Sequence, residues 1–488
     1  MTMAASKHAP LGLGLKVGYS SGQLVEGVIN NALAYFLLFY VTTACGLGGG
    51  LAGIALSIGL IIDAVMDPLI GSLSDGWRSR IGRRLPFMLA GVVPLAVCFV
   101  LVFALPSGLS QIGLAIWVAG LLIVMRISMS LFVLPYQAVS AELSDDYRER
   151  SSLMSWRWGI GQIGALMVMI LGFGVFLGGK NGLTNRAAYL PFGLSLAAIF
   201  TGGALLAIWI TRLTRERQHA PSATHGALGS RVFRELVEVF RNRSFRTLFF
   251  GALLFFVAIG VYSALTLHAN TFFWRISAGQ TQMVTLSLFG GLLLGAPLAG
   301  PLLARFEKAT ILTAGMLGLG LGMGAPFLLR FAGLLPLTGQ PLTLVLSLIG
   351  LFAGSLMAAA AIAFMAMIAD AADEHEFLFG ARREGLFFAG WAFASKAATG
   401  LGALISGTVL QVIHFPTDLA QHGGMDAVLP TAMTTQLAWF TGPGTALLSI
   451  AAALINLGYR LDRKKHAAIL VDLEARHAAA ADRPLAAE

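Results

Sequence analysis

Apolar windows of about twenty residues recur along nearly the whole 488-residue chain. A hydrocarbon core roughly 30 Å thick needs about 20 apolar residues for each helix that crosses it. Inside that core every backbone polar group must be satisfied within the spanning structure. Only 12% of the residues are charged, whereas soluble domains carry about 25%. The sequence therefore predicts an all-α membrane protein.

Twelve such windows divide into two groups of six around a polar segment. They cover residues 17–43, 51–74, 85–106, 112–141, 152–177, 189–212, 247–268, 281–304, 309–332, 341–369, 384–412 and 433–458. We expect an N-terminal bundle at 1–212, a cytoplasmic central loop at 213–246, a C-terminal bundle at 247–459 and a cytoplasmic tail at 460–488. Within the loop, RVFRELVEVF at 231–240 is predicted to be an amphipathic helix on the membrane surface.

An internal repeat relates the two groups. DPLIGSLSD at 67–75 aligns with APLAGPLLA at 296–304, and each is followed by a basic turn and another apolar window. PYQAVSAEL at 135–143 aligns with AFMAMIADA at 363–371. Related halves are typical of transporters built from two repeats. The prediction is two pseudo-symmetric six-helix bundles.

Lysine and arginine gather in loops that fall on one side of the predicted spans. The main basic segments are 78–84, 148–150, 212–217, 231–243 and 460–465. Short cytoplasmic loops collect these residues, so both termini and the central loop are expected in the cytoplasm, with the spans in the inner or plasma membrane. The net charge of +9 is then explained by the basic loops that set the topology and that contact anionic lipid. No nucleic-acid partner is expected. Cys45 and Cys98 are too few for a disulfide framework or a zinc cluster.

Asp63 and Asp67 lie inside the second apolar window, four residues apart. That spacing places both carboxyls on one helix face, at a cost of roughly 2.5 to 3.5 kcal/mol for each charge at bilayer depth. The pair must share a proton, bind a hard cation such as Na⁺, or use a nearby lysine. Pro68 frees a backbone carbonyl that could also hold a cation. An ion pair with Lys396 or Arg126 that only locks helices together is the alternative.

Arg126 lies in the middle of the fourth window and also needs a partner. The candidates are Glu26 on the first window, the two carboxylates on the second, and an acidic substrate such as a uronide. An internal ion pair and a substrate contact are compatible at different steps of one cycle.

Three stretches together resemble a known family. DAVMDPLIGSLSDGWRSRIGRRLPF, LPYQAVSAELSDDYRERSSLMSWR and IADAADEHEFLFGARREGLFFAGWAFASKAATGLG are similar to the signature regions of the glycoside-pentoside-hexuronide:cation symporters. These are melibiose-permease-like members of the major facilitator superfamily. The resemblance covers residues 15 to 460 and implies twelve helices in two bundles, alternating access, and coupling of uptake to Na⁺ or H⁺.

The resemblance also implies roles for single residues. Asp63 and Asp67 match the family's cation-binding carboxylates, and Ser130 matches a hydroxyl ligand to the cation. Lys396 matches a lysine near the cation and sugar sites, and Arg157 lies at or beside an arginine of the fifth helix. The residues expected to contact substrate are Glu26, Arg126, Gln137, Arg157, Trp391 and Lys396.

Three positions depart from the family's sugar site. The aspartate of the first helix is replaced by Gly27, with Glu26 beside it, and the aspartate of the fourth helix is replaced by Val133. Gln137 stands where an aromatic residue stacks on the sugar. The loss of both sugar-binding carboxylates argues against an ordinary neutral galactoside.

Charged residues at the inner ends of the spans are expected to form a cytoplasmic gate. They are Asp75, Arg83, Arg84, Glu142, Asp146, Arg150, Asp370, Asp373, Arg382 and Arg383. Exposed pairs contribute only 0 to about 1 kcal/mol each, yet a network that forms in one state can set the conformational balance. Plain topology determinants are the alternative. His268 and His375 are expected to be solvated at helix ends.

No motif in the chain supplies the catalytic core of an enzyme, and neither a Walker loop nor HExxH occurs in it. The sequence predicts a secondary active transporter that imports a glycoside, hexuronide or related sugar with Na⁺ or H⁺, as a monomer without a cofactor. A lipid-like or other organic-acid substrate is the first alternative. A non-transporting membrane sensor or scaffold on the same fold is the second.

Overall fold

A computed structural model describes residues 11–77, 79–144, 146–179, 181–217, 238–380, 383–417, 419 and 424–481. None of these residues lies in a β-strand. The predicted amphipathic stretch at 231–240 and the central loop lie mostly outside the described residues.

Eleven helical segments within the described ranges are long and apolar enough to cross a membrane. They contain α3 (Gly49–Gly76), α4 (Leu85–Val102), α5 (Gln111–Glu142), α6 (Tyr147–Met169) with η4 (Ile170–Phe176), α7 (Tyr189–Leu213), α9 (Arg243–Phe272), α10 (Ala278–Arg305), α11 (Lys308–Phe331), α12 (Gly339–Phe379), α13 (Glu384–Val412), and α14 (Thr431–Trp439) with η9 (Phe440–Gly444) and α15 (Thr445–Asn456).

The first predicted span is helical as well, but it alternates between helix types along its length. It consists of α1 (Leu13–Ser20), the 3₁₀ turn η1 (Ser21–Gln23), α2 (Leu24–Ala32) and the π-helical turns η2 (Leu33–Leu37) and η3 (Tyr40–Ala44). Such local changes of helix type are frequent at functional sites. With this span, the described residues contain helical segments at all twelve predicted windows, and the all-α fold class is confirmed.

The described helices form two compact units. Unit 1 contains residues 1–225, 263–283 and 399–438, and unit 2 contains 226–262, 284–398 and 439–488. Helices α9, α10, α13 and α14 therefore contribute residues to both units. The predicted bundle boundaries at 213–246 stay a prediction.

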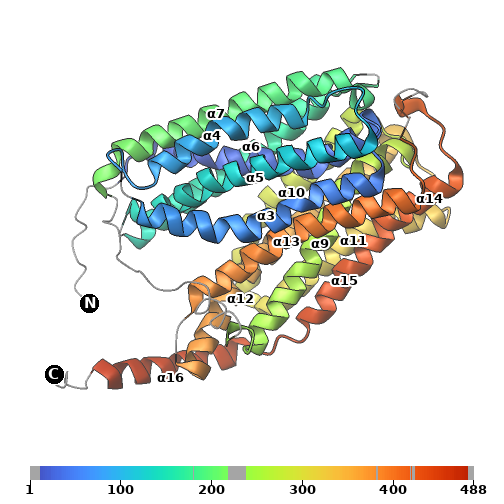
Figure 1. Ribbon diagram of the computed structural model, residues 1–488. Helices are drawn as coiled ribbons and strands as arrows, with labels where there is room; N and C mark the ends of the chain where they lie inside the picture. The colour runs from blue at the N-terminus through green and yellow to red at the C-terminus, as the bar shows by residue number, and fades with distance from the viewer. Residues whose placement is uncertain are drawn as a thin grey trace. The chain divides into compact units, whose positions relative to one another are not determined.

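In unit 1, α3 and α4 both pack along α5, and α2 packs against α6 (Figure 1). Glycines allow the closest approaches, as is common in membrane helices. A Cβ atom at Gly27 of α2 would lie 2.2 Å from the Gly161 carbonyl oxygen of α6, and one at Gly91 of α4 would lie 2.6 Å from the Ser128 carbonyl oxygen of α5. At these glycines the helices of unit 1 touch backbone against backbone. Because α3 also packs along α5, side chains on the facing sides of these two helices can meet.

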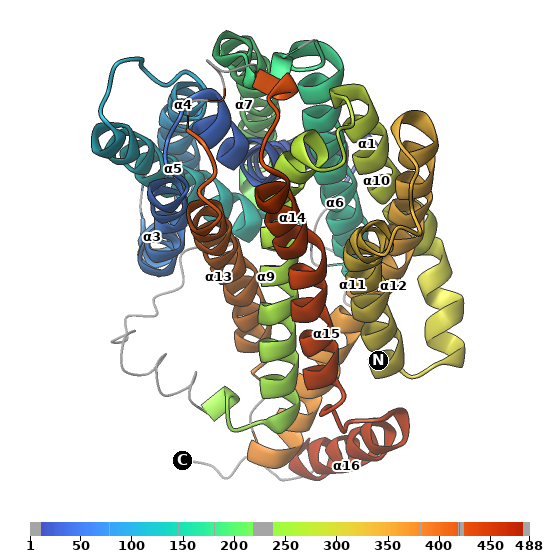
Figure 2. The same ribbon diagram turned by 90° about the vertical axis from the view of Figure 1, so that its right-hand side faces the viewer.

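Unit 2 has an apolar core made by parts of α9, α11, α12, α13 and α15. Leu312 and Met316 of α11, Ala363 and Met367 of α12, and Ala452 of α15 are fully or almost fully buried in it. A further helix, α16 (Arg463–Ala481), lies across the ends of this bundle (Figure 2). The sequence analysis assigned its residues only to a tail.

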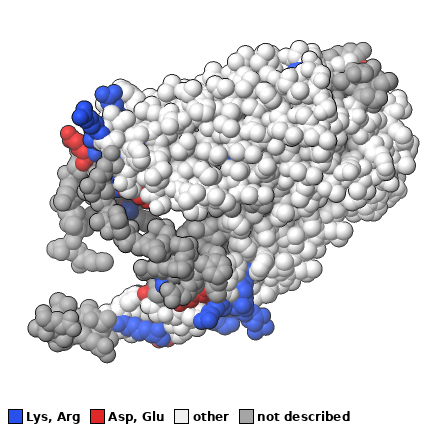
Figure 3. Space-filling view, viewed as in Figure 1, with Lys and Arg blue, Asp and Glu red and all other residues white. Residues whose placement is uncertain are grey.

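The charged side chains of each unit gather at helix ends. Figure 3 shows lysine and arginine at one end of the unit 1 helices and along α16 of unit 2, whereas the long sides of both units are uncharged on the face shown. This distribution is the one expected of helices whose sides face lipid.

Candidate functional site

Two side-chain pairs join α3 to α5 at the acidic positions. Arg126 Nη1 lies 3.3 Å from Asp63 Oδ2, and Ser130 Oγ donates a hydrogen bond of 2.6 Å to Asp67 Oδ1. Both helices advance by one turn between the first pair and the second, because each step is four residues. We call these two contacts the α3–α5 pairs. The structure thus brings together all three predicted cation-binding residues and Arg126.

The first of these pairs is largely shielded from solvent. The side chains of Arg126 and Asp63 are 15% and 8% exposed, so their attraction is screened far less than that of a surface pair. Gly59, one turn before Asp63, provides the room, since a Cβ atom there would lie 2.9 Å from Arg126 Nε. Of the partners that the sequence left open for Arg126, the structure selects a carboxylate of the second window.

A second polar cluster links η1, α2, α5 and α6. Gln23 Nε2 donates to Glu26 Oε2 at 2.6 Å, and Gln137 Nε2 donates to the same oxygen at 3.3 Å. Arg157 Nη2 donates to Gln23 Oε1 at 3.0 Å. We call Gln23, Glu26, Gln137 and Arg157 the glutamine cluster. It unites three of the predicted substrate residues around one that the sequence analysis missed.

Arg157 is held in place by more than Gln23. Its Nη1 atom donates to Ser140 Oγ at 2.9 Å, and its guanidinium carbon lies 4.7 Å from the centre of the Tyr136 ring. The residue is only 8% exposed, and among the described residues its Nε atom has no hydrogen-bond partner. Gln137, in contrast, is exposed and Glu26 is partly exposed. The cluster therefore has a fixed cationic base and an accessible edge of oxygen and amide groups.

Two of the three positions that depart from the family's sugar site, Gly27 and Val133, have packing roles. Gly27 faces the backbone of α6 at Gly161, which leaves no room for any side chain. Val133 is buried on α5. The acidic group that α2 contributes to this region is Glu26, one residue before the glycine.

Trp391 and Lys396 belong to unit 2. Trp391 is partly buried and packs against that unit's apolar core. Lys396 is partly buried on the same helix, α13. Their predicted roles at the substrate site stay predictions.

Four of the predicted gate residues of unit 1, Asp75, Arg83, Arg84 and Glu142, form one connected ion-pair group. Arg84 lies 3.1 Å from Asp75 Oδ1 and 3.0 Å from Glu142 Oε1, and Arg83 also pairs with Glu142. The Glu142 side chain is 12% exposed and the Asp75 side chain 62%. Farther along, Asp146 accepts a hydrogen bond from the Glu149 backbone and thereby caps the N-terminus of α6. Arg150 is exposed.

The gate residues of unit 2 contact α16 and its neighbourhood. Asp370 Oδ2 lies 2.6 Å from Lys308 Nζ, and His466 of α16 lies 3.1 Å from Asp373 Oδ2. Arg383 lies 3.9 Å from Glu238, and Arg382 falls outside the described residues. The sequence analysis named the two aspartates but not the helix that they bind. The gating role of both groups stays a prediction.

The expectation for His268 and His375 was wrong, because both side chains are fully buried. His268 shares a 3.0 Å hydrogen bond with Thr42 and packs against Phe39 and Phe415. His375 packs between aromatic rings of α12 and α13. A position near the end of a hydrophobic window does not reveal whether neighbouring segments cover it.

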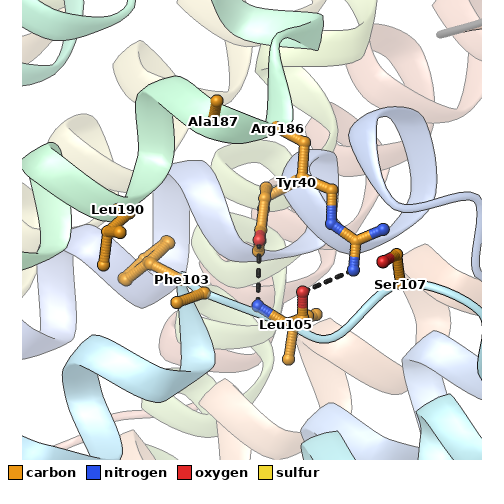
Figure 4. A pocket seen from close by; sticks show the side chains of 8 residues that line it. Tyr40, Phe103, Leu105, Ser107, Arg186, Ala187 and Leu190 are labelled. Atoms are coloured by element: carbon orange, nitrogen blue, oxygen red, sulfur yellow. Dashed lines mark hydrogen bonds between the residues drawn. The ribbon is translucent and has the colours of Figure 1, made fainter.

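One pocket of about 350 Å³ lies elsewhere in unit 1 (Figure 4). Tyr40, Phe103, Leu105 and Arg186 line it, and Arg186 donates a hydrogen bond to the Leu105 carbonyl oxygen while the Leu105 N–H donates to the Tyr40 hydroxyl. None of its lining residues is a predicted site residue. Its polar groups bind each other, which suits a structural role for this end of the bundle.

Comparisons with known proteins identify the class of the molecule. A family profile described as "MFS/sugar transport protein" matches residues 18–463. An uncharacterized symporter of Bacillus subtilis, YnaJ, is 28% identical over 467 residues, which cover 94% of each chain. A glucuronide carrier protein homolog of Escherichia coli is 26% identical over 81% of this chain and 82% of that one. The structure of a D-xylose-proton symporter superposes with a TM-score of 0.60 at 15% identity, over 93% of this chain and 98% of that one.

The apolar helices of the described residues and this structural likeness define a multi-pass membrane protein of the major facilitator fold. The chain belongs to the MFS/sugar transport protein family, since the profile spans nearly all of it. It is a secondary active transporter of a small molecule, and the family membership confirms the expectation that the chain is not an enzyme.

Proposed function

We propose that this protein couples the uptake of a sugar derivative to a cation gradient, with the carboxylates of the α3–α5 pairs as the coupling site. The observation that carries the proposal is the geometry of these pairs: two acidic side chains on one face of α3, each bound to a polar group of α5. Ionisable side chains within membrane helices mark ion and substrate pathways. A site whose charge changes when a cation binds can bias one transporter conformation over another.

The glutamine cluster is the proposed substrate site. Sugar hydroxyls donate and accept hydrogen bonds, and the cluster offers the Glu26 carboxylate, the amides of Gln23 and Gln137, and the Arg157 guanidinium. A cation beside amide groups also suits a sugar acid, because arginine binds carboxylates with two hydrogen bonds. The glucuronide carrier homolog supports a hexuronide as one candidate substrate. Arg126, Trp391 and Lys396 stay proposed substrate contacts.

The surrounding charges support an orientation and a gate. We place both termini and the central loop in the cytoplasm of the inner or plasma membrane, because the basic segments fall at that end of the predicted spans. The ion-pair groups around Glu142 and Asp370 are then cytoplasmic, and their opening and closing would accompany alternating access. We propose a monomer without a resident cofactor and without a nucleic-acid partner.

Uptake of a labelled panel by cells that express the protein tests this function. The panel contains neutral glycosides, hexuronides and lysolipids, each supplied with and without Na⁺ and with and without an imposed pH gradient. Accumulation of a glycoside or hexuronide above the external concentration supports the proposal. Accumulation of lysolipids alone supports the lipid-like alternative, and no uptake of any compound by well-expressed protein supports a sensor or scaffold.

A further inference from the structure

Helix α12 ends in a group of four carboxylates. The helix has 41 residues, so it is about 60 Å long at 1.5 Å per residue, whereas a hydrocarbon core is roughly 30 Å thick. Asp370, Asp373, Glu374 and Glu376 follow directly on the predicted apolar window 341–369. They repel one another, and they lie at the helix end where the backbone dipole is already negative. The last turn of α12 contains no basic residue, so positive charge has to come from other elements.

Helix α16 packs along this end of α12 and places two histidines on the carboxylates (Figure 2). His466 Nε2 lies 3.1 Å from Asp373 Oδ2 and 3.7 Å from Asp370 Oδ1. His477 Nε2 lies 2.8 Å from Glu376 Oε1. The three carboxylate side chains are only 11 to 13% exposed, so water screens their charge less than it would at an open surface.

Other contacts of α16 do not involve a histidine. Arg463, at the start of the helix, donates hydrogen bonds of 2.8 and 3.3 Å to the Leu303 and Phe306 carbonyl oxygens at the end of α10. Leu473 is 5% exposed, and it shares one helix face with His466 and His477 because these residues are seven and four positions away. Helix α16 thus has a permanent anchor at its start, and an ionisable contact on each side of a buried leucine.

We propose that α16 is a pH-sensitive latch on the ends of α10 and α12, docked when His466 and His477 are protonated and released as the pH rises. Histidine is the side chain that ordinarily changes its charge between about pH 5 and 8. A protonated imidazole attracts the carboxylates of α12, whereas a neutral one keeps at most a hydrogen bond. Each histidine takes one proton from water when α16 docks and returns it on release, and no other reactant is needed.

The latch acts on two residues of the proposed gate. The inference rests on the proposed function, in which this end of unit 2 is cytoplasmic and the ion-pair group of Asp370 opens and closes during transport. While α16 is docked, His466 lies against both Asp370 and Asp373 and holds them in place. An acidic cytoplasm should therefore slow the carrier, and release of α16 should free the gate.

The charged groups around the two histidines have other side chains. Lys308 of α11 binds both oxygens of Asp370, at 2.9 and 2.6 Å. The further charged neighbours in the described part of α10, α11, α12 and α16 are Arg305, Glu307, Glu374, Asp462, Arg463, Lys464, Lys465, Glu474 and Arg476. Lysine, arginine and carboxylates ordinarily titrate outside about pH 6 to 8.5. Burial raises the pKa of the Tyr459 hydroxyl, which therefore stays neutral.

His375 is one more histidine at this end of α12. It is fully buried and packs against the rings of Phe379 and Phe387. A variant that changes only His466 and His477 separates its effect from theirs.

Distances between two spin labels test the latch without substrate. The labels are attached to Leu378→Cys on α12 and Val471→Cys on α16, both exposed positions, in purified full-length protein with Cys45→Ala and Cys98→Ala. A narrow distance distribution at pH 6 should become broad at pH 8.5. The ratio of released to docked molecules should rise roughly 5- to 30-fold, since two charge-assisted contacts are lost.

Two variants show whether the histidines cause this change. The double variant His466→Gln/His477→Gln should give the broad distribution at both pH values. Lys464→Gln, which removes an exposed charge from the same helix, is the matched control and should keep the wild-type response. If the double variant does not fold, His477→Gln alone, at a side chain that is 64% exposed, should reduce the response.

Three results would overturn the latch. They are an unchanged distribution in wild type between pH 6 and 8.5, a full pH response in the glutamine variants, and a double variant that stays docked at pH 8.5.

Exchange of a transported panel compound across proteoliposomes tests the effect on the gate. The pH and the Na⁺ concentration are equal on both sides, and variants are compared at one pH, so the pH dependence of coupling itself cancels. At pH 6 the double variant should exchange severalfold faster than wild type, and at pH 8.5 the two rates should agree. Equal rates at pH 6 would refute control of the gate by α16. If no panel compound is transported, the proposed function fails, whereas the label distances need no substrate and still decide the latch.

Discussion

Arg126 and Asp63 form a largely buried ion pair between α5 and α3, with 3.3 Å between Nη1 and Oδ2. One turn farther along α3, Asp67 accepts a hydrogen bond from the Ser130 hydroxyl of the same neighbouring helix, α5. Two chemically identical residues one turn apart thus contact different groups of α5.

Gly59→Val should disrupt the Arg126–Asp63 pair without a change in either partner. The new side chain would overlap the stem of Arg126, because even a Cβ atom lies 2.9 Å from Nε. We expect loss of concentrative uptake with normal membrane insertion. Gly71→Val on the same helix is the matched control, since nothing lies within 4 Å of a Cβ atom there. Equal uptake by both variants would contradict the importance of the ion pair.

Gln23→Ala should weaken substrate binding about tenfold while expression stays normal. The amide bridges Arg157 and Glu26, and a hydrogen bond to a charged group contributes about 1.5 to 3 kcal/mol. Asn30→Ala, at an exposed position of α2 in the same membrane span, should leave binding unchanged. The measurement is the concentration dependence of uptake for the best compound of the panel. If the two variants reach half-maximal uptake at similar substrate concentrations, the glutamine cluster is not part of the substrate site.

Glu142→Gln should destabilise the protein far more than Asp75→Asn. Glu142 is 12% exposed and pairs with both Arg83 and Arg84, whereas Asp75 is 62% exposed. Removal of one partner from a buried ion pair costs about 3 kcal/mol, and an exposed pair is worth less than about 1 kcal/mol. Thermal unfolding of the two purified variants compares these costs. Similar unfolding temperatures for the two variants would mean that solvent screens the ion pairs of Glu142 as strongly as the pair of Asp75.

A cysteine at position 222 should react with a membrane-impermeant maleimide only after cells are opened, because the basic segments place the central loop in the cytoplasm. The native thiols should add little background. Burial raises the pKa of Cys45 to about 11, so at pH 7 this thiol is protonated and reacts slowly, and Cys98 is buried within α4. Labelling of Ser222→Cys in intact cells would reverse the proposed orientation.

The membrane fold could be predicted because bilayer thickness and hydropathy fix the length and number of helices. The acidic pair could be found because a charge in an apolar window is rare and the i, i+4 spacing fixes its face. The partner of Arg126 could not be found, since Glu26, Asp63, Asp67 and an acidic substrate all satisfy the same need for a negative charge. Only the packing of α3 on α5 selects Asp63.

Other features left weaker signals in the sequence. Gln23 is an ordinary polar residue, and only its position three residues before Glu26 on one helix indicated that the two could meet. Helix α16 is polar on average, so a search for apolar windows passes over it, although it supplies His466 to Asp373. His268 is buried because the rings of Phe39 and Phe415 pack against it. These two residues lie far apart in the sequence, so no local pattern predicts that they meet at His268.

Concentrative uptake by Asp67→Asn protein tests the account most directly. Asparagine keeps the shape and hydrogen bonding of the side chain but removes its charge and its proton. We predict that the variant inserts normally, exchanges substrate down a gradient, and reaches an internal concentration of about that outside, because the coupling between cation and substrate is lost. If the Asp67→Asn variant accumulates substrate to the same ratio as wild type, the α3 carboxylate is a structural partner and the proposed coupling site is wrong.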